Sequence, residues 1–176
     1  MARIPLRQPD DMNTGERAQY DRFPSNLSRT LLIANSRLAA ALPNTANALR
    51  ATELDAKWRE GVILRVAALN DSAYERMQHL DQAKKEGWST SQLAAIETGD
   101  SAALAPDFAA IMAFVDAIVA GPHVPDTTFD TVRSLLSDRD VVTIILLVGH
   151  YMTVARLLGI LQVELDDKPD SWTSEH

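Results

Sequence analysis

The 176-residue chain contains no cysteine, and this absence removes several kinds of chemistry at once. Without thiols the chain has no disulfide, no thiolate nucleophile and no cysteine-ligated metal. Dithiol-dependent peroxidase activity is excluded for the same reason, because no thiolate is present to reduce a peroxide.

An excess of basic residues and a long apolar run are also missing. The net charge is −7 at pH 7, which argues against a nucleic-acid-binding surface. The longest apolar stretch, residues 141–149, is interrupted by Thr143 and is shorter than the roughly 18 residues of a membrane-spanning helix. The N-terminus has no apolar segment typical of a signal peptide. We therefore expect a cytoplasmic protein with no nucleic-acid and no membrane partner.

Glycine is scarce, with seven residues in the chain, and no glycine-rich phosphate loop is present. The G-x-G-x-x-G pattern of dinucleotide-binding proteins is absent as well. Glu75 and His79 alone would supply only two metal ligands, and no nearby histidine pair completes a set. The sequence therefore predicts no cofactor and no metal.

The residues that are present predict an all-α protein. Alanine and leucine are abundant, and no alternating apolar and polar run reaches the length of a strand. We expect one domain, with an N-terminal arm and helical layer over residues 1–50, a core over 51–165 and a polar tail over 166–176. Pro43 is expected to bend or divide its helix. The expected helices cover about residues 14–22, 26–34, 36–50, 53–69, 72–86, 90–96, 106–120, 126–136 and 138–165.

A carboxylate and an imidazole four residues apart are the main chemical motif. Glu75 and His79 share one face of a helix, with Cβ atoms about 5–6 Å apart, which suits general acid–base catalysis. Glu60 lies on the preceding helix among apolar neighbours, and a buried carboxylate needs a partner. A structural partner would be Arg65 or Arg156, and a functional partner would be His79.

Ser72 and Glu75 also form the sequence pattern of a helix capping box. The Ser72 hydroxyl would accept from the Glu75 backbone N–H, while the Glu75 side chain would reach back to the Ser72 N–H. A helix N-terminus favours an anion, so we expect a lowered Glu75 pKa. His79 would then be the general acid or base, with Glu75 or Glu60 orienting it.

The same stretch, residues 59–87, resembles the core motif of the carboxymuconolactone decarboxylase family, which shares its fold with the alkylhydroperoxidase D-like peroxidases. The peroxidase branch carries a Cys-x-x-Cys pair where this chain has Ser72 and Glu75. The decarboxylase branch lacks that pair and is similar to this chain in having glutamate at position 75 and histidine at position 79. The resemblance is close over residues 59–87 and loose over residues 30–165.

The resemblance implies an alkylhydroperoxidase D-like helical bundle, here with an N-terminal helical extension. It also implies a homo-oligomer, either a dimer, a trimer or a hexamer. The last predicted helix supports this expectation independently. From Val141 to Leu161 it is apolar nearly all round, more than one face of a small domain can bury.

The resemblance also implies a cofactor-free lyase that decarboxylates a small carboxylated lactone or a related carbonyl acid. His79 would carry the proton, and Glu60 and Glu75 would orient the His79 imidazole. Two alternatives stay open: a non-catalytic binding or assembly module on a peroxidase-like fold, and a hydrolase or isomerase of lactones or ketones.

Further residues are candidates for contacts with the substrate. Aromatic side chains could line an organic pocket, although aromatics at helical spacing are more often core residues. Arg65 or Arg76 could hold a carboxylate. His150, next to Tyr151 in a very apolar helix, is either a core or subunit-contact residue or part of the site. The predicted substrate-binding residues are Ser72, Tyr74, Trp58, Arg65 and His150.

Overall fold

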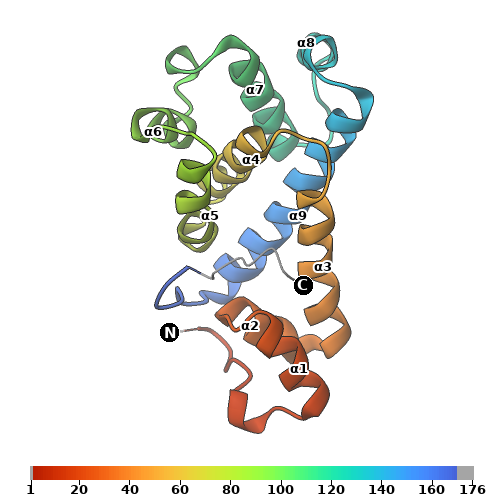
Figure 1. Ribbon diagram of the computed structural model, residues 1–176, viewed down its shortest axis with the longest axis vertical. Coiled ribbons are helices and arrows are strands. Elements are labelled where there is room, and N and C mark those ends of the chain that lie inside the picture. The colour runs from red at the N-terminus through yellow and green to blue at the C-terminus, as the bar shows by residue number, and fades with distance from the viewer. Residues whose placement is uncertain (1, 170–176) are drawn as a thin grey trace.

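The structure is a computed structural model that describes residues 2–169. Within this range the regular structure is entirely helical, which confirms the all-α prediction (Figure 1). Two short 3-10 turns, Pro9–Asp11 and Ser101–Ala103, accompany the α-helices. The α-helices are α1 (Thr14–Arg22), α2 (Asn26–Ala34), α3 (Ser36–Arg50), α4 (Ala56–Leu69), α5 (Ala73–Lys85), α6 (Thr90–Thr98), α7 (Pro106–Ala120), α8 (Asp126–Leu135) and α9 (Asp138–Leu161).

Helix α4 is the centre of the molecule, and α5, α6, α7 and α9 pack around it (Figure 1). Every residue from Arg59 to Ala67 is buried, so the helix is enclosed on all sides. Gly61 allows two aromatic rings to approach the helix closely. A Cβ atom at this position would lie 2.5 Å from Phe108 Cζ and 2.9 Å from Trp88 Cζ2, so no larger residue fits without a shift of these buried rings.

Helices α4 and α5 form a hairpin around a short break. Asp71 adopts a left-handed φ of 51°, and Ser72 caps α5 by accepting from the Glu75 N–H at 3.3 Å. Gly87, with φ of 93°, ends α5 in a Schellman motif in which the Trp88 N–H donates to the Ala83 carbonyl at 3.1 Å. The two helices therefore run antiparallel, and residues on either side of the break face each other.

The N-terminal helices form a separate layer against the far half of α9. Helix α9 runs from near α8 toward α2, and α3 lies beside it (Figure 1). The segment after α9 then returns to α2, where the Asn26 N–H donates to Asp166 Oδ1 at 2.8 Å. This layer closes one side of the α4–α5 hairpin.

Several predicted boundaries differ from the structure. Helix α4 begins at Ala56, three residues after the predicted start, because Asp55 is the N-cap and accepts from the Trp58 N–H at 3.0 Å. Helix α9 ends at Leu161, because Gln162 turns into the left-handed region. Pro43 lies inside α3 and does not divide it, since both flanking turns bury residues against the rest of the layer. Most of the predicted polar tail lies outside the described residues.

Helix α9 buries one face and exposes another. Its buried face includes Ile144, Leu147 and Val148. Among the described helices it is the one that is long and apolar enough to cross a membrane, a test that core helices of soluble proteins also pass. Its exposed apolar residues are Val142, Ile145, Leu146 and Ile160.

Candidate active site

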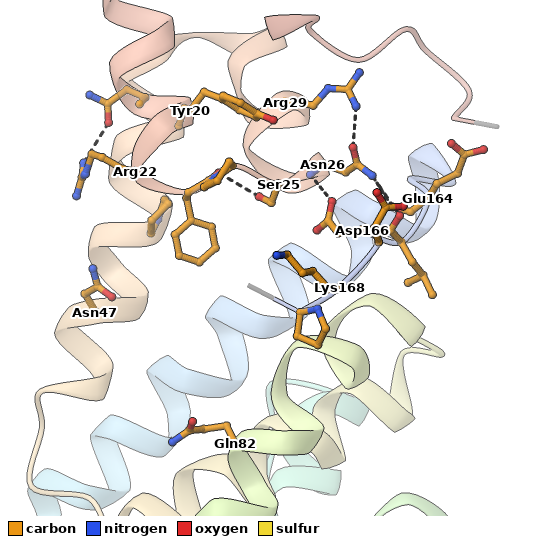
Figure 2. A pocket seen from close by; sticks show the side chains of 18 of the residues that line it. Tyr20, Arg22, Ser25, Asn26, Arg29, Asn47, Gln82, Glu164, Asp166 and Lys168 are labelled. Atoms are coloured by element: carbon orange, nitrogen blue, oxygen red, sulfur yellow. Dashed lines mark hydrogen bonds between the residues drawn. The ribbon is translucent and has the colours of Figure 1, made fainter. Parts of the chain in front are cut away.

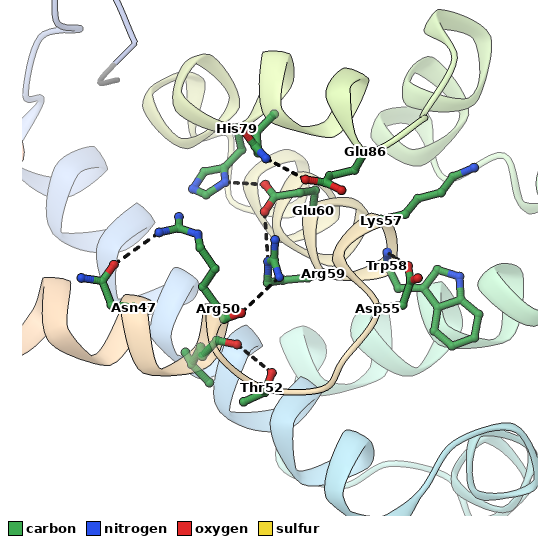
Figure 3. Close-up of polar contacts among 12 residues, drawn as sticks. Asn47, Arg50, Thr52, Asp55, Lys57, Trp58, Arg59, Glu60, His79 and Glu86 are labelled. Carbon is green, nitrogen blue, oxygen red and sulfur yellow. Dashed lines mark hydrogen bonds and ion pairs between the residues drawn. The ribbon is translucent and has the colours of Figure 1, made fainter. Parts of the chain in front are cut away.

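A buried chain of three charged or polar side chains connects α4 to α5 (Figure 3). His79 Nδ1 lies 2.8 Å from Glu60 Oε2, and the Arg59 Nε–H donates to Glu60 Oε1 at 3.1 Å. Glu60 is 0% exposed and His79 2% exposed. The partners of the Glu60 carboxylate are therefore His79 and its own neighbour Arg59. Neither Arg65 nor Arg156, the structural partners suggested by the sequence, takes this place.

The contacts of Glu60 determine which nitrogen of His79 carries a proton. Burial alone would raise the pKa of Glu60, but the hydrogen bonds and charges of His79 and Arg59 hold this pKa below its ordinary value. Glu60 is thus a carboxylate and can only accept hydrogen bonds. His79 Nδ1 must then be the donor, and Nε2 is left facing the other side of the ring.

Glu75 lies on that other side. Its Oε2 atom is 3.7 Å from His79 Nε2, too far for a direct hydrogen bond but close enough for a shared ligand or water. Burial, opposed in part by His79, raises the pKa of Glu75 to about 7. The lowered pKa expected from the helix N-terminus is therefore wrong, because loss of hydration outweighs the helix dipole at this buried position.

The capping box predicted from the sequence is only half formed. Ser72 accepts from the Glu75 N–H, but no return bond from the Glu75 side chain to the Ser72 N–H is made. The Ser72 N–H donates instead to the Ala67 carbonyl at 2.9 Å. The Glu75 carboxyl group is consequently available to a pocket and is not used by the backbone.

Glu75 and His79 line a small pocket of about 40 Å³ between α3, α5 and α9. This volume holds roughly two or three water molecules. The pocket is closed mostly by apolar side chains. Its lining residues are Phe23, Leu27, Leu42, Pro43, Ala46, Tyr74, Glu75, Gln78, His79, His150, Tyr151 and Val154.

Tyr151 places a phenol in this pocket. Its ring meets the His79 ring edge-on, with centroids 5.0 Å apart. Burial, together with the charges of Glu75 and Glu60, raises the pKa of Tyr151 far above its ordinary value, so the hydroxyl stays protonated. Among the described residues no hydrogen bond to this hydroxyl is formed, which leaves a donor available to a ligand.

His150 also lines the pocket, and its ring packs edge-on against Tyr151 at 5.1 Å. Burial and the neighbouring His79 lower the pKa of His150, so it is a neutral imidazole. Tyr74 forms another part of the wall. Its hydroxyl accepts from the Leu27 N–H at 3.3 Å and donates to Asp166, so the same residue ties α5 to the N-terminal layer.

The structure does not bring the other candidate residues to this pocket. Ser72 is a helix cap, as described above. Trp58 packs against the hydrophobic core, and its indole points away from Glu60 and His79 (Figure 3). Arg65 makes a bidentate pair with Asp116, at 2.6 and 2.8 Å, on another side of α4.

Sequence reasoning did not assign roles to Arg59, Gln78 and Tyr151. Gln78 lies three residues after Glu75, so the helical spacing already placed it on the same stripe. The sequence shows Tyr151 only as a polar residue in an apolar helix. Its contact with His79 depends on tertiary packing and could not be predicted. Among the described residues, no group of three His, Asp or Glu side chains is arranged to hold a metal ion.

The molecule also has a much larger groove, of about 1,140 Å³ (Figure 2). It lies between the N-terminal layer, the segment 164–169 and Gln82 of α5. Phe23 and Pro43 line both cavities. Residues of the groove that carry charge are Arg22, Arg29, Arg50, Glu164, Asp166, Asp167 and Lys168.

Comparison with known proteins agrees with the resemblance seen in the motif. Residues 36–120 match the family described as the carboxymuconolactone decarboxylase family. No curated protein sequence matches the chain.

Two solved structures share the fold. A peroxidase-related protein from Ralstonia eutropha JMP134, named as an alkylhydroperoxidase AhpD core, has a TM-score of 0.79 and 17% identity, covering 94% of this chain and 93% of its own. A protein of unknown function from Agrobacterium tumefaciens, described as a putative antioxidant defence protein AhpD, has a TM-score of 0.67 and 20% identity. The alignment covers 73% of this chain and 90% of that protein. These similarities confirm the predicted alkylhydroperoxidase D-like fold.

Proposed function

We propose that this chain is a cofactor-free acid–base enzyme that decarboxylates a small lactone acid or a related carbonyl acid. The match of residues 36–120 to the carboxymuconolactone decarboxylase family supports this reaction class. The observation that carries the proposal is the buried Arg59–Glu60–His79 chain, which ends beside Glu75 in a pocket. Glu75 adds a second carboxyl group, with a pKa near 7, beside this chain. An ion pair with a purely structural role would not need such a group.

The chemistry requires one proton and an electron sink in the substrate. The bond between the ring carbon and the carboxylate breaks, CO₂ leaves, and the electron pair moves into the substrate's carbonyl as an enolate. A proton from the His79–Glu75 pair is then delivered to carbon, and water restores it to the pair. With a pKa near 7, Glu75 is about half protonated at neutral pH, which suits a group that must both give and regain a proton.

Tyr151 supports the same chemistry by stabilising negative charge. Its protonated hydroxyl can donate to the oxygen on which the enolate charge develops, in a site from which water is largely excluded. Replacing it with phenylalanine should lower turnover about 10²–10³-fold, the usual effect of losing one such donor.

The test is a panel of small carbonyl acids with CO₂ release measured, applied to wild type, His79→Gln and Ser72→Ala. Glutamine is chosen because its amide can still donate to the buried Glu60, whereas alanine would leave that carboxylate with fewer partners. His79→Gln should lower the rate about 10²–10⁴-fold at an unchanged melting temperature. Ser72→Ala should keep turnover and lose about 0.5–2 kcal/mol of stability. A serine-centred mechanism would replace this one if the two variants behaved in the opposite way.

The same panel separates the alternative functions. An isomerase on this scaffold would release no CO₂ but would exchange a substrate carbon-bound proton for deuterium in heavy water, and this exchange would depend on His79. A lactone hydrolase would open the ring and release acid without CO₂. A binding or assembly module would do none of these.

A further inference from the structure

Arg59 belongs to the buried chain but does not line the small pocket. Its side chain is held from two sides (Figure 3). The Nε–H donates to Glu60 Oε1 at 3.1 Å, and the Nη1–H donates to the Arg50 backbone carbonyl at 3.4 Å. This carbonyl belongs to the last residue of α3, where helix carbonyls have no partner within the helix. The guanidinium is therefore fixed between Glu60 and the end of α3.

The charges of the buried chain balance only when Arg59 is included. Glu60 is 0% exposed and His79 2% exposed, so a single uncompensated charge on this pair is costly. Arg59 is permanently protonated, and its positive charge offsets the Glu60 carboxylate. His79 can then stay neutral, with one proton on Nδ1 and none on Nε2.

Without the charge of Arg59, the Glu60 carboxylate would be a buried anion with no permanent cation beside it. The Glu60–His79 pair would then take up one proton from solvent. In one outcome the Nδ1 proton passes to Glu60, and the new proton binds Nε2. In the other, Glu60 stays ionised, and the new proton on Nε2 makes an imidazolium. Both outcomes place a proton on Nε2, the nitrogen that faces Glu75.

The influences on Glu60 agree with this charge argument. Burial is the largest and raises the Glu60 pKa, while the hydrogen bonds and charges of His79 and Arg59 hold this pKa below its ordinary value. The contribution of His79 depends on where its own protons are, whereas the charge of Arg59 does not change. Arg59 is thus the constant charge in the chain.

The groups on the pocket side do not replace Arg59. Glu75 titrates near pH 7, and its negative charge above that pH favours a proton on Nε2, which opposes the effect of Arg59. Tyr151 keeps its proton and His150 is neutral, so these two side chains add no charge. The titratable or charged groups near this cluster, besides its own members, are Glu75 of α5, His150 and Tyr151 of α9, and Arg50 of α3.

We propose that Arg59 is a positioning residue: its charge keeps Glu60 a hydrogen-bond acceptor, which holds the His79 proton on Nδ1 and leaves Nε2 free to take up and return a proton in the pocket. This assignment deepens the proposed function and rests on it for the reaction. The positions of the protons can be measured without that reaction.

The experiment locates the protons on the His79 ring by ¹⁵N NMR of the full chain without substrate. Protonated and unprotonated ring nitrogens give separate signals, and His79→Gln identifies the His79 signals among those of the four histidines. In Arg59→Met, Nε2 should keep its proton to a pH about one unit higher than in wild type, a roughly tenfold gain in proton affinity. Arg65→Met is the matched control, since Arg65 is similarly buried on α4 but paired with Asp116. It should titrate as wild type does.

Two results would overturn the proposal. One is the same Nε2 titration in wild type and Arg59→Met. The other is an equal shift in Arg65→Met, because the effect would then follow from the loss of any buried arginine. A thermal melt checks that each variant folds. If Arg59→Met does not fold, Arg59→Gln provides the same test, since its amide can still donate to Glu60 but carries no charge.

Turnover separates this assignment from the proposed function. CO₂ release should fall about tenfold or more in Arg59→Met at neutral pH, because a protonated Nε2 cannot take up a further proton. Arg65→Met should keep the wild-type rate. A wild type that releases no CO₂ but shows the Arg59-dependent titration would count against decarboxylation alone. CO₂ release that needs His79, together with an unchanged titration in Arg59→Met, would count against the role of Arg59 alone.

Discussion

Glu75 is buried and has a pKa near 7, so its charged form opposes folding. An unfolded glutamate releases its proton near the ordinary value of 4.5, while the folded protein keeps it up to about pH 7. Between these values the native state binds more protons, and stability falls as the pH rises. This shift corresponds to roughly 3 kcal/mol, lost progressively across that window.

Glu75→Gln should therefore become more stable relative to wild type as the pH rises from about 4 to 8, by on the order of 3 kcal/mol. Urea denaturation at several pH values measures the difference between the two proteins. Asp130→Asn, at an exposed position in α8, is the control and should show no such trend. A wild-type-minus-variant difference that stays flat across this range would mean that the pKa of Glu75 is the same in the folded and the unfolded chain.

Arg65 has a structural role that its sequence position did not reveal. Besides its bidentate pair with Asp116, its Nη1–H donates to the Ile96 carbonyl at 3.0 Å, and the guanidinium packs over Gly99. Arg65→Met leaves the Ile96 carbonyl and the Asp116 carboxylate without this donor and should cost about 1–3 kcal/mol of stability. CO₂ release from the carbonyl acids should not change. A melting curve and the CO₂-release assay on one preparation check both statements, and slower release at unchanged stability would return Arg65 to the site.

The sequence predicted those site residues that local spacing brings together. Glu75 and His79 share a helix face, and the two-residue break at Asn70 and Asp71 forces α4 to return beside α5, which brings Glu60 to His79. Tyr151 could not be placed in this way, because it comes from α9 and its approach to His79 depends on tertiary packing.

The Glu75 pKa was missed for a related reason. The helix N-terminus can be recognised from the sequence, but the depth of burial that outweighs it cannot.

At the scale of whole elements, capping residues marked most helix starts correctly. Ser25, Ser72, Ser89 and Ser137 each accept from a backbone N–H of the turn that follows. The wrong predictions arose where tertiary packing outweighed the local sequence pattern. Pro43 costs α3 a backbone hydrogen bond, yet the helix continues because Ala39, Ala46 and Leu49 are buried on either side of it.

Asp166, in the segment after α9, contacts both α2 and α5 and provides an element-scale prediction. Its carboxylate accepts from the Tyr74 hydroxyl of α5, from the Asn26 N–H at the start of α2, and from Gln78 Nε2 at 3.3 Å. Asp166→Ala removes the acceptor of all three hydrogen bonds and should cost about 1–3 kcal/mol. Because α4 and α5 are held by other contacts, hydrogen exchange should speed up in α1 and α2 and stay slow in α4. Equal acceleration in both regions would mean that the N-terminal layer and the core open together.

At the scale of the molecule, one face of α9 has no partner among the described residues. Val142 is 55% exposed, and Leu146, one turn later, is 58% exposed, so the two form a short apolar stripe. Ile160, 63% exposed, lies on the same side of the helix beyond the exposed Thr153 and Arg156. Large apolar side chains exposed together in this way are typical of an interaction site. We therefore expect this stripe to form the contact in the homo-oligomer that the sequence predicted.

Leu146→Glu should dissociate that homo-oligomer, because a carboxylate in the centre of an apolar interface loses its hydration without gaining a partner. Light scattering at micromolar concentration should give a multiple of the 19.3 kDa chain mass for wild type and the single chain mass for the variant. Leu38→Glu is the matched control, since Leu38 is 48% exposed but lies on α3. It should leave the oligomer intact. A wild-type monomer would show that this stripe has another partner, and binding of wild type to lipid vesicles, lost in Leu146→Glu, would identify a membrane surface as that partner.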